Sequence, residues 1–210
     1  MDLLDILGNS SKTENSEDKI SYSAGVVMAQ SLKDIGFDEI DFNDFLDGFK
    51  TNFNGNYTKI PKKKAIDIFN NYVTILRADQ LKKNTEISAQ FLEKNKEKEG
   101  VVTLASGLQY KILTEGKGEK PKLDDRLKVL YEGYLMNKNV FDITKDDGPL
   151  DFHLSEAILG WQEALQLMPV GSRWEITIPS HLAYGEKGAA PMIEPNAVVS
   201  YIIELLEIEK

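Results

Sequence analysis

The spacing of apolar residues changes from a helical to a strand period near residue 100, and this change limits the possible folds more than any other feature. Up to about residue 98, large apolar side chains recur every three or four positions, as on one face of a helix. From Val101 onward they alternate with polar residues, as in half-buried strands. A chain of 210 residues with helices in one half and strands in the other is typical of the α+β class.

Capping residues mark the first two helices of the N-terminal half. A helix is expected over residues 20–32, with Gly36 as its C-cap. Asp41 is expected as the N-cap of a short, phenylalanine-rich helix that ends at Asn54-Gly55-Asn56. The chain starts with a short acidic stretch, residues 1–7, followed by a polar sequence, and residues 1–18 are expected to be a flexible tail.

A third and longer helix is expected to begin with Pro61 as its first residue and to end before Gly100. Its first half has a wide apolar stripe, whereas its second half is mostly polar, which is typical of a solvent-exposed spacer. We therefore expect a helical domain over 19–60, a connecting stalk helix over 61–99 and a sheet domain over 100–210.

The helical domain has too few residues to bury its aromatic side chains alone. Its apolar face predicts a homodimer formed through the N-terminal helices. The alternative is a small three-helix cap packed on the chain's own C-terminal half.

In the C-terminal half, alternation marks four main strands and one helix. The strands are expected around Leu108–Ile112, Leu127–Leu135, Trp174–Ile178 and Val199–Leu205, and the helix over Glu156–Leu167. Strands joined by loops, with a single helix among them, predict an antiparallel sheet wrapped around a short α-helix.

Charge and cysteine content exclude several classes of function. The formal net charge is −9, which argues against nucleic acid as a partner. The chain has no cysteine, so disulfides, thiolate catalysis and cysteine-based zinc sites are excluded. The N-terminus has neither a basic start nor a long apolar run, so we expect no membrane association and a cytoplasmic location, or a periplasmic one if a signal peptide has been removed.

The residues that suggest chemistry are mostly aromatic, with a single carboxylate. Phe141-Asp142, Gly160-Trp161 and Tyr184 contain no paired carboxylates and no nucleophile with a base. His153 and His181 are isolated, so no metal is expected. Taken singly, Asp142 is most often a local cap and Trp161 a core residue. Together they suit a site that holds an apolar group and offers one or two hydrogen bonds.

A series of short motifs in the C-terminal half resembles the FKBP family of peptidyl-prolyl cis–trans isomerases. The motifs are Val129–Leu135, Phe141-Asp142, Pro149 with Phe152, Ile158–Trp161, Met168–Gly171, Ile178-Pro179, Leu182–Gly185 and Ile193 with Pro195–Ala197. In the N-terminal half, Asp18–Gly25 and the junction around Asn95–Tyr110 resemble the macrophage infectivity potentiator branch, which has a helical dimerisation domain, a stalk helix and a C-terminal isomerase domain.

The resemblance implies an isomerase of X–Pro bonds that acts in protein folding on proline-containing polypeptide clients, with chaperone activity and without a cofactor. It also implies that macrolides such as tacrolimus or rapamycin bind in the same pocket. A non-catalytic chaperone or adaptor module of the same fold, and a purely structural dimer, are the alternatives.

The resemblance also assigns roles to residues. Trp161 is expected as the floor under the proline ring, the Tyr184 hydroxyl as a donor to a ligand carbonyl, and Asp142 as the group that polarises the amide. The N–H of Ile158 is expected as a further donor. The walls are expected from Tyr131, Phe141, Phe152, Ala157, Ile158, Ile193 and Tyr201. Tyr201 stands where the family usually has phenylalanine, so its hydroxyl needs a partner.

Overall fold

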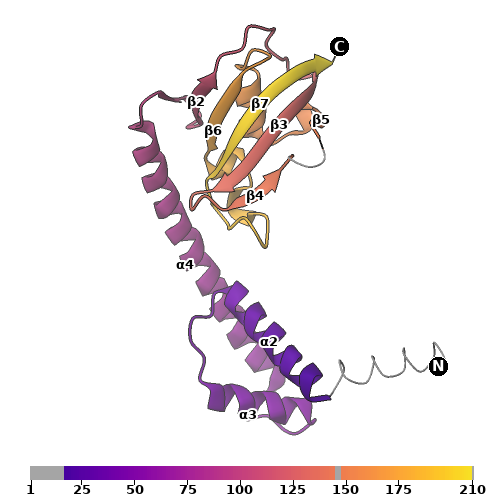
Figure 1. Cartoon of the computed structure of the whole chain (residues 1–210). Helices are drawn as coiled ribbons and strands as arrows, with labels where there is room; N and C mark the ends of the chain where they lie inside the picture. The colour runs from indigo at the N-terminus through magenta and orange to yellow at the C-terminus, as the bar shows by residue number, and fades with distance from the viewer. Residues whose placement is uncertain (1–16, 145–147, 210) are drawn as a thin grey trace, which may run out of the picture. The chain divides into compact units, whose positions relative to one another are not determined.

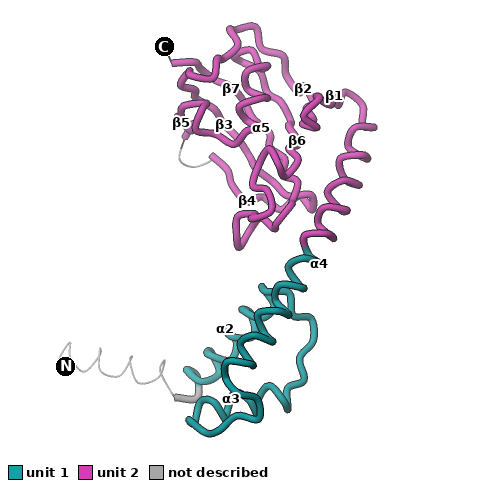
Figure 2. The backbone as a smooth tube through the Cα atoms, turned by 180° about the vertical axis from the view of Figure 1, so that it is seen from behind, with its two compact units in different colours: residues 1–80 teal, residues 81–210 magenta. Residues whose placement is uncertain are grey.

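The computed structural model describes residues 17–144 and 148–209, which form two compact units (Figure 2). The first unit is Met1–Gln80 and the second is Leu81–Lys210. Most of the predicted tail lies outside the described residues; its last two positions, Glu17 and Asp18, are the first residues of a helix.

Three helices form the N-terminal half: α2 (Glu17–Ile35), α3 (Phe42–Phe53) and α4 (Lys62–Lys96) (Figure 1). Gly36 follows α2 with a φ of 102°, a conformation that favours glycine. The Asp41 carboxylate accepts hydrogen bonds from two N–H groups in the first turn of α3. Both predicted caps are therefore confirmed.

The first unit leaves its apolar side chains at the surface. Among its described side chains, residues 19–80, none is buried. An apolar groove of about 790 Å³, here called the α2–α3 groove, is lined by side chains that include Met28, Leu32, Phe45, Leu46 and Phe49. The amphipathic pattern thus produces the helices and an apolar face, but this face is not covered within the unit.

Helix α4 starts and ends close to its predicted limits and runs through both units. The carbonyl of Pro61 accepts the N–H of Ala65 at 3.0 Å, which makes Pro61 the N-cap rather than the first helical residue. Gly100, with a φ of 78°, follows the helix. The buried residues of α4 are all polar, and they lie in the half that the sequence predicted as an exposed spacer; that prediction is wrong for this face of the helix. Within the described residues, no helix is long and apolar enough to span a bilayer.

The second unit is built on one antiparallel sheet, as predicted. Its strands lie in the order β1-β2-β6-β7-β3-β4, and β5 also pairs with β3. The strands are β1 (Val101–Thr103), β2 (Gln109–Thr114), β3 (Arg126–Leu135), β4 (Val140–Ile143), β5 (Leu150–His153), β6 (Arg173–Ile178) and β7 (Val199–Glu209). Strand β7, the longest, lies between β3 and β6 at the centre of the sheet (Figure 1).

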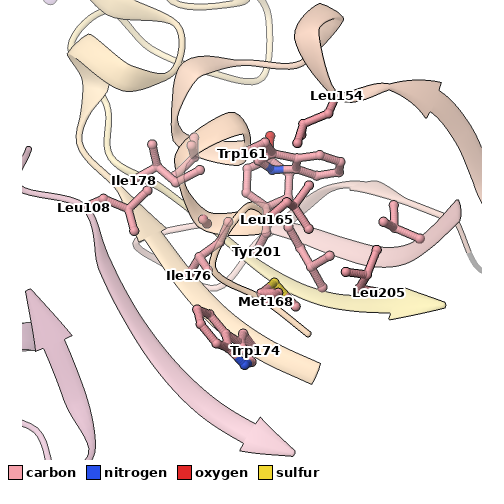
Figure 3. Close-up of a cluster of buried hydrophobic side chains, with 14 of the residues drawn as sticks. Leu108, Leu154, Trp161, Leu165, Met168, Trp174, Ile176, Ile178, Tyr201 and Leu205 are labelled. Carbon is pink, nitrogen blue, oxygen red and sulfur yellow. The ribbon is translucent and has the colours of Figure 1, made fainter. Parts of the chain in front are cut away.

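Besides the C-terminal part of α4, this unit contains the α-helix α5 (Leu159–Leu165), which packs against the sheet and closes the core (Figure 3). Leu165 and Met168 meet Ile176, Ile203 and other fully buried side chains of the strands. The helix is shorter than predicted at both ends. It starts late because Ile158 is extended (φ −60°, ψ 149°). It ends early because the chain tightens after Leu165: the N–H groups of Leu167 and Met168 bond to carbonyls three residues back, at 3.0 and 3.1 Å.

Candidate functional site

A cavity of about 290 Å³ opens between β3, β5, α5 and the loop that follows β6. Its lining is mostly aromatic and apolar, with one aspartate and one glutamate. The lining residues are Tyr131, Asp142, Leu150, Phe152, Glu156, Ala157, Ile158, Trp161, Tyr184 and Tyr201. The volume lies at the lower end of the range for small-ligand pockets, so it suits a group the size of a proline ring with its neighbouring amide.

Trp161 forms the innermost wall of this cavity and is almost completely buried. Its ring makes edge-on contacts with three aromatic rings of the site, with centroid distances of 5.1 to 5.6 Å. The indole can lie this deep because Gly160 lets α5 approach the sheet closely: a Cβ at that position would be 2.3 Å from the Ile178 side chain. The prediction that Gly160 allows a close approach is confirmed, and the approaching group is Ile178.

A second glycine places the aromatic pair behind the cavity. Gly133 on β3 pairs with Tyr201 on β7, and a Cβ there would be 2.7 Å from the Tyr201 ring and 2.9 Å from the Phe141 ring. The two rings meet edge to face at 5.6 Å. Tyr201 reaches the cavity from this position, whereas Phe141 supports it from behind.

The carboxylate of the site is held by a tyrosine. The Tyr131 hydroxyl donates to Asp142 Oδ2 at 2.7 Å, and these residues lie on neighbouring strands, β3 and β4. Burial raises the pKa of the Tyr131 hydroxyl well above its usual range, and the hydrogen bond to Asp142 raises it further. The Tyr131 hydroxyl therefore stays protonated at every physiological pH and holds one oxygen of Asp142, an exposed residue in the lining of the cavity.

The hydroxyl groups of Tyr184 and Tyr201 lie 3.0 Å apart and form a hydrogen bond. Tyr201 is buried, whereas Tyr184 is half-buried at the rim. Burial raises the pKa of the Tyr201 hydroxyl well above its usual range, and the bond to Tyr184 adds to this. Either hydroxyl can be the donor in this bond. When Tyr201 donates, the Tyr184 hydrogen remains for a ligand carbonyl.

The structure brings eight of the ten predicted site residues to one cavity. The two exceptions are Phe141, which packs behind Tyr201, and Ile193, which is buried in the core and pairs with Ala189. Direct contact of these two with a ligand stays a prediction. The sequence did not select Leu150 or Glu156 as site residues. The alternation of Leu150 with Phe152 on β5 was a usable signal, whereas Glu156 has none, because it reaches the cavity from a single 3-10 turn, Leu154–Glu156, before α5.

The arrangement supports binding and polarisation more than bond-breaking chemistry. The polar groups of the cavity are three phenol hydroxyls and two carboxylates, with no hydroxyl–histidine pair in its lining. In the part of the chain that the structure describes, no three histidine, aspartate or glutamate side chains gather as a metal site would require. The N–H of Ile158, at the start of α5, donates to no described acceptor and is available to a ligand carbonyl.

Two family models match the chain. Residues 117–206 match the model described as FKBP-type peptidyl-prolyl cis-trans isomerase. Residues 17–112 match the model described as the domain amino terminal to FKBP-type peptidyl-prolyl isomerase.

Curated proteins and solved structures agree with these matches. The peptidyl-prolyl cis-trans isomerase Mip of Coxiella burnetii is 39% identical over 207 residues, which cover 95% of this chain and 89% of that protein. The outer membrane protein MIP of Legionella longbeachae is 38% identical and covers 92% of this chain and 86% of its own length. The crystal structure of FkpA from Escherichia coli superposes with a TM-score of 0.72 at 29% identity and covers 93% of this chain and 98% of its own.

Proposed function

The chain belongs to the family of FKBP-type peptidyl-prolyl cis–trans isomerases, and we propose that the cavity around Trp161 is where it isomerises X–Pro bonds. The single observation that carries this assignment is that Tyr131, Asp142, Trp161, Tyr184 and Tyr201, predicted from scattered motifs, line one cavity. The family membership makes the protein an isomerase; the roles of individual residues below are our proposal.

The cavity can accelerate the rotation by removing water from the prolyl amide. Resonance in the planar amide gives a barrier of about 18–20 kcal/mol and makes the planar form more polar than the twisted one. An apolar, aromatic pocket stabilises the less polar twisted form relative to the planar form, which is differential binding of the transition state. The Trp161 indole, in this proposal, is the apolar floor on which the proline ring rests.

The polar groups orient the amide in this proposal. With Tyr201 as the donor in the bond between the two tyrosines, the Tyr184 hydroxyl donates to a substrate carbonyl at the rim. The Asp142 carboxylate, held by Tyr131, places negative charge beside the amide carbon. The N–H of Ile158 donates to a second carbonyl. No covalent intermediate is needed, since only a torsion angle changes.

An exchange assay with a Leu-Pro or Phe-Pro peptide tests this function. The full chain is expected to accelerate cis-to-trans conversion above the uncatalysed rate, and rapamycin, if it occupies the same cavity, is expected to inhibit it. Trp161→Phe keeps an aromatic ring in place, so a folded Trp161→Phe protein that is slower by an order of magnitude or more supports the assigned floor. An inactive but folded wild-type chain overturns the proposal.

We also propose that the first unit forms a homodimer through the α2–α3 groove, with residues 19–60 as the dimerisation domain, 61–99 as a stalk and 100–210 as the isomerase domain. The support is the absence of any buried side chain among residues 19–80 together with the groove of about 790 Å³. A second copy of the same apolar groove is the occupant whose chemistry matches it. Such a dimer carries two active sites, which can bind one client at the same time and so strengthen its binding, in line with the predicted chaperone activity.

The location in the cell stays part of this proposal. The expected cytoplasmic location is not supported by the relatives, because one of them is named an outer membrane protein. We propose the periplasm, the alternative that the sequence left open. Fractionation of cells that produce the full-length protein from its natural gene tests this proposal, and recovery with a cytoplasmic marker enzyme contradicts it.

A further inference from the structure

Three polar residues, all on one face of α4, are the ones that this helix buries. Asn84, Ser88 and Asn95 are spaced by four and seven positions, which places them on the same side of the helix, and each is at most 8% exposed. Burying a polar side chain is unfavourable unless it forms hydrogen bonds. The hydrogen-bond partners of these side chains therefore show which part of the molecule this face of the helix binds.

Two consecutive residues of a distant loop provide the partners for one turn of α4. Asn84 Nδ2 donates to the carbonyl of Pro195 at 2.8 Å, and Ser88 Oγ donates to the carbonyl of Asn196 at 2.8 Å. The Asn196 side chain in turn donates to Thr85 Oγ1 at 3.0 Å. These bonds join residues more than 100 positions apart in the sequence, all of them inside the second unit. We call Asn84, Thr85, Ser88, Pro195 and Asn196 the α4 clamp.

The clamped loop continues to the rim of the catalytic cavity. The N–H of Asn196 donates to the carbonyl of Gly185 at 2.8 Å, and Gly185 follows Tyr184 directly. Between them, Ala189 and Ile193 exchange two backbone hydrogen bonds of 2.8 Å, which closes the loop on itself. One hydrogen bond thus separates the clamp from the residue next to the rim tyrosine.

Asn196 itself is in a conformation that needs support. Its φ of 57° lies in the left-handed region, which is uncommon outside glycine and which asparagine adopts more often than most other residues. The side chain, the carbonyl and the N–H of Asn196 are all engaged, with Thr85, Ser88 and Gly185 respectively. Loss of the α4 bonds would leave the bond to Gly185 and the turn bond from the Ala197 N–H to the Glu194 carbonyl at 3.2 Å to hold this conformation.

We propose that Asn84, Thr85 and Ser88 of α4 are positioning residues for the isomerase site, which act through Asn196 and Gly185 on the rim residue Tyr184. The helix is then part of the catalytic apparatus and not only a connector. Binding of substrate at the rim and docking of the helix stabilise each other, because linkage between two sites is reciprocal. The effect on substrate affinity rests on the proposed function of the cavity, whereas the effect on the loop does not.

The test compares Ser88→Ala and Asn84→Ala with the wild type in the full chain. Each change removes one hydrogen bond of the clamp, so hydrogen exchange of the Asn196 N–H is expected to become about fivefold faster, the factor for one typical hydrogen bond. The KM for a Leu-Pro peptide is expected to rise about threefold while kcat changes by less than twofold. The reason is that the rim helps to bind the substrate, whereas the apolar floor, which favours the twisted amide, is unchanged. Ser88→Thr keeps the hydroxyl and is expected to restore both values.

Gln90→Ala changes an exposed side chain of the same helix and is the matched control, with no expected effect. If Asn84→Ala does not fold, Thr85→Val removes the acceptor of the Asn196 side chain at an exposed position. If hydrogen exchange of the Asn196 N–H is unchanged in these variants, the α4 clamp does not hold the loop. If this exchange becomes faster but the KM is unaltered, the clamp does not act on the isomerase site. A wild-type chain that exchanges slowly at Asn196 but isomerises no peptide contradicts the proposed function and leaves the clamp standing.

Discussion

The two units of this chain contain similar kinds of apolar residues but use them differently. In the second unit, side chains such as Leu127, Ile176 and Leu205 are fully buried between the sheet and α5. In the first unit, Phe42, Leu46 and Phe49 remain exposed by 39–72%. A helical unit of this size gains too little burial by itself to offset the loss of chain entropy. We infer from this difference that the second unit is stable by itself, whereas the first unit needs a partner surface to cover its apolar face.

The largest expected effect comes from a matched pair of isoleucine truncations. Ile176→Ala opens a cavity in the core of the second unit and is expected to lower its free energy of unfolding by about 2–5 kcal/mol. Ile66→Ala changes a residue of the first unit that is 50% exposed. In dilute protein it is expected to lower the free energy of unfolding by less than half as much. Urea unfolding followed by tryptophan fluorescence and helix content measures both. If both substitutions lower the free energy of unfolding equally at all protein concentrations, the first unit does not depend on a partner surface.

A charge in the α2–α3 groove sharpens the comparison further. Leu46→Lys places an ammonium group where a second copy is proposed to pack, and we expect the dimer dissociation constant to rise about 100-fold, or roughly 2.7 kcal/mol. Sedimentation velocity at micromolar concentration measures the mass. Asp67→Lys, on an exposed part of α4 outside the groove, is the control. An unchanged dimer mass for Leu46→Lys, or a monomeric wild type, rejects the groove as an interface.

The fold was largely predictable because its signals are local. Asp41 and Gly36 act within one turn of their own helices, and strand alternation reports directly on burial against a sheet. The polar half of α4 was misinterpreted for a physical reason: hydropathy predicts burial by apolar contact, whereas Asn84 and Ser88 are buried by hydrogen bonds to carbonyls more than 100 residues away.

The sequence predicted most of the residues that form the site, but not the contacts between them. Motif resemblance brought Trp161, Asp142 and Tyr184 together, since short motifs preserve residue types. It did not predict that the Tyr201 hydroxyl pairs with Tyr184, nor that Phe141 packs against Tyr201, because such contacts depend on side-chain directions from two strands and a loop.

A self-sufficient isomerase unit predicts that site substitutions act on rate without acting on assembly. Asp142→Asn removes the negative charge that Tyr131 holds and that is proposed to face the amide, so kcat/KM for a Leu-Pro peptide is expected to fall about 10- to 100-fold. Tyr131→Phe, which removes the donor but keeps the charge, is expected to cost less. Dimer mass is expected to stay the same in both. A rate unaffected by Asp142→Asn rejects the role given to this carboxylate.

A smaller effect is expected from Tyr201→Phe. The change removes the hydroxyl that shares a hydrogen bond with Tyr184 and is expected to lower kcat/KM about fivefold, the value of one hydrogen bond. In a Tyr184→Phe background the same change is expected to have almost no further effect. Additive losses in this double-mutant cycle would show that the two hydroxyls act independently.

The smallest effect concerns stability at high pH. Burial raises the pKa of Tyr134 and Tyr201 above the value of about 10 expected in the unfolded chain, so the folded state holds these protons more tightly. Their contribution is fully present below pH ~10 and decreases as the pH rises above it. Thermal unfolding at pH 8 and pH 11 is expected to show a smaller loss for Tyr201→Phe than for the wild type. An identical loss would mean that Tyr201 titrates normally.

The most direct test of the central claim is to produce residues 81–210 alone, which keep the α4 clamp and the whole sheet unit, and to measure their peptide isomerisation and their mass in the same preparation. We expect a folded monomer whose kcat/KM for a Leu-Pro peptide lies within twofold of that of the full chain. A fragment that dimerises, or one that is folded but inactive, would contradict a self-sufficient isomerase unit joined to a helical unit that serves assembly.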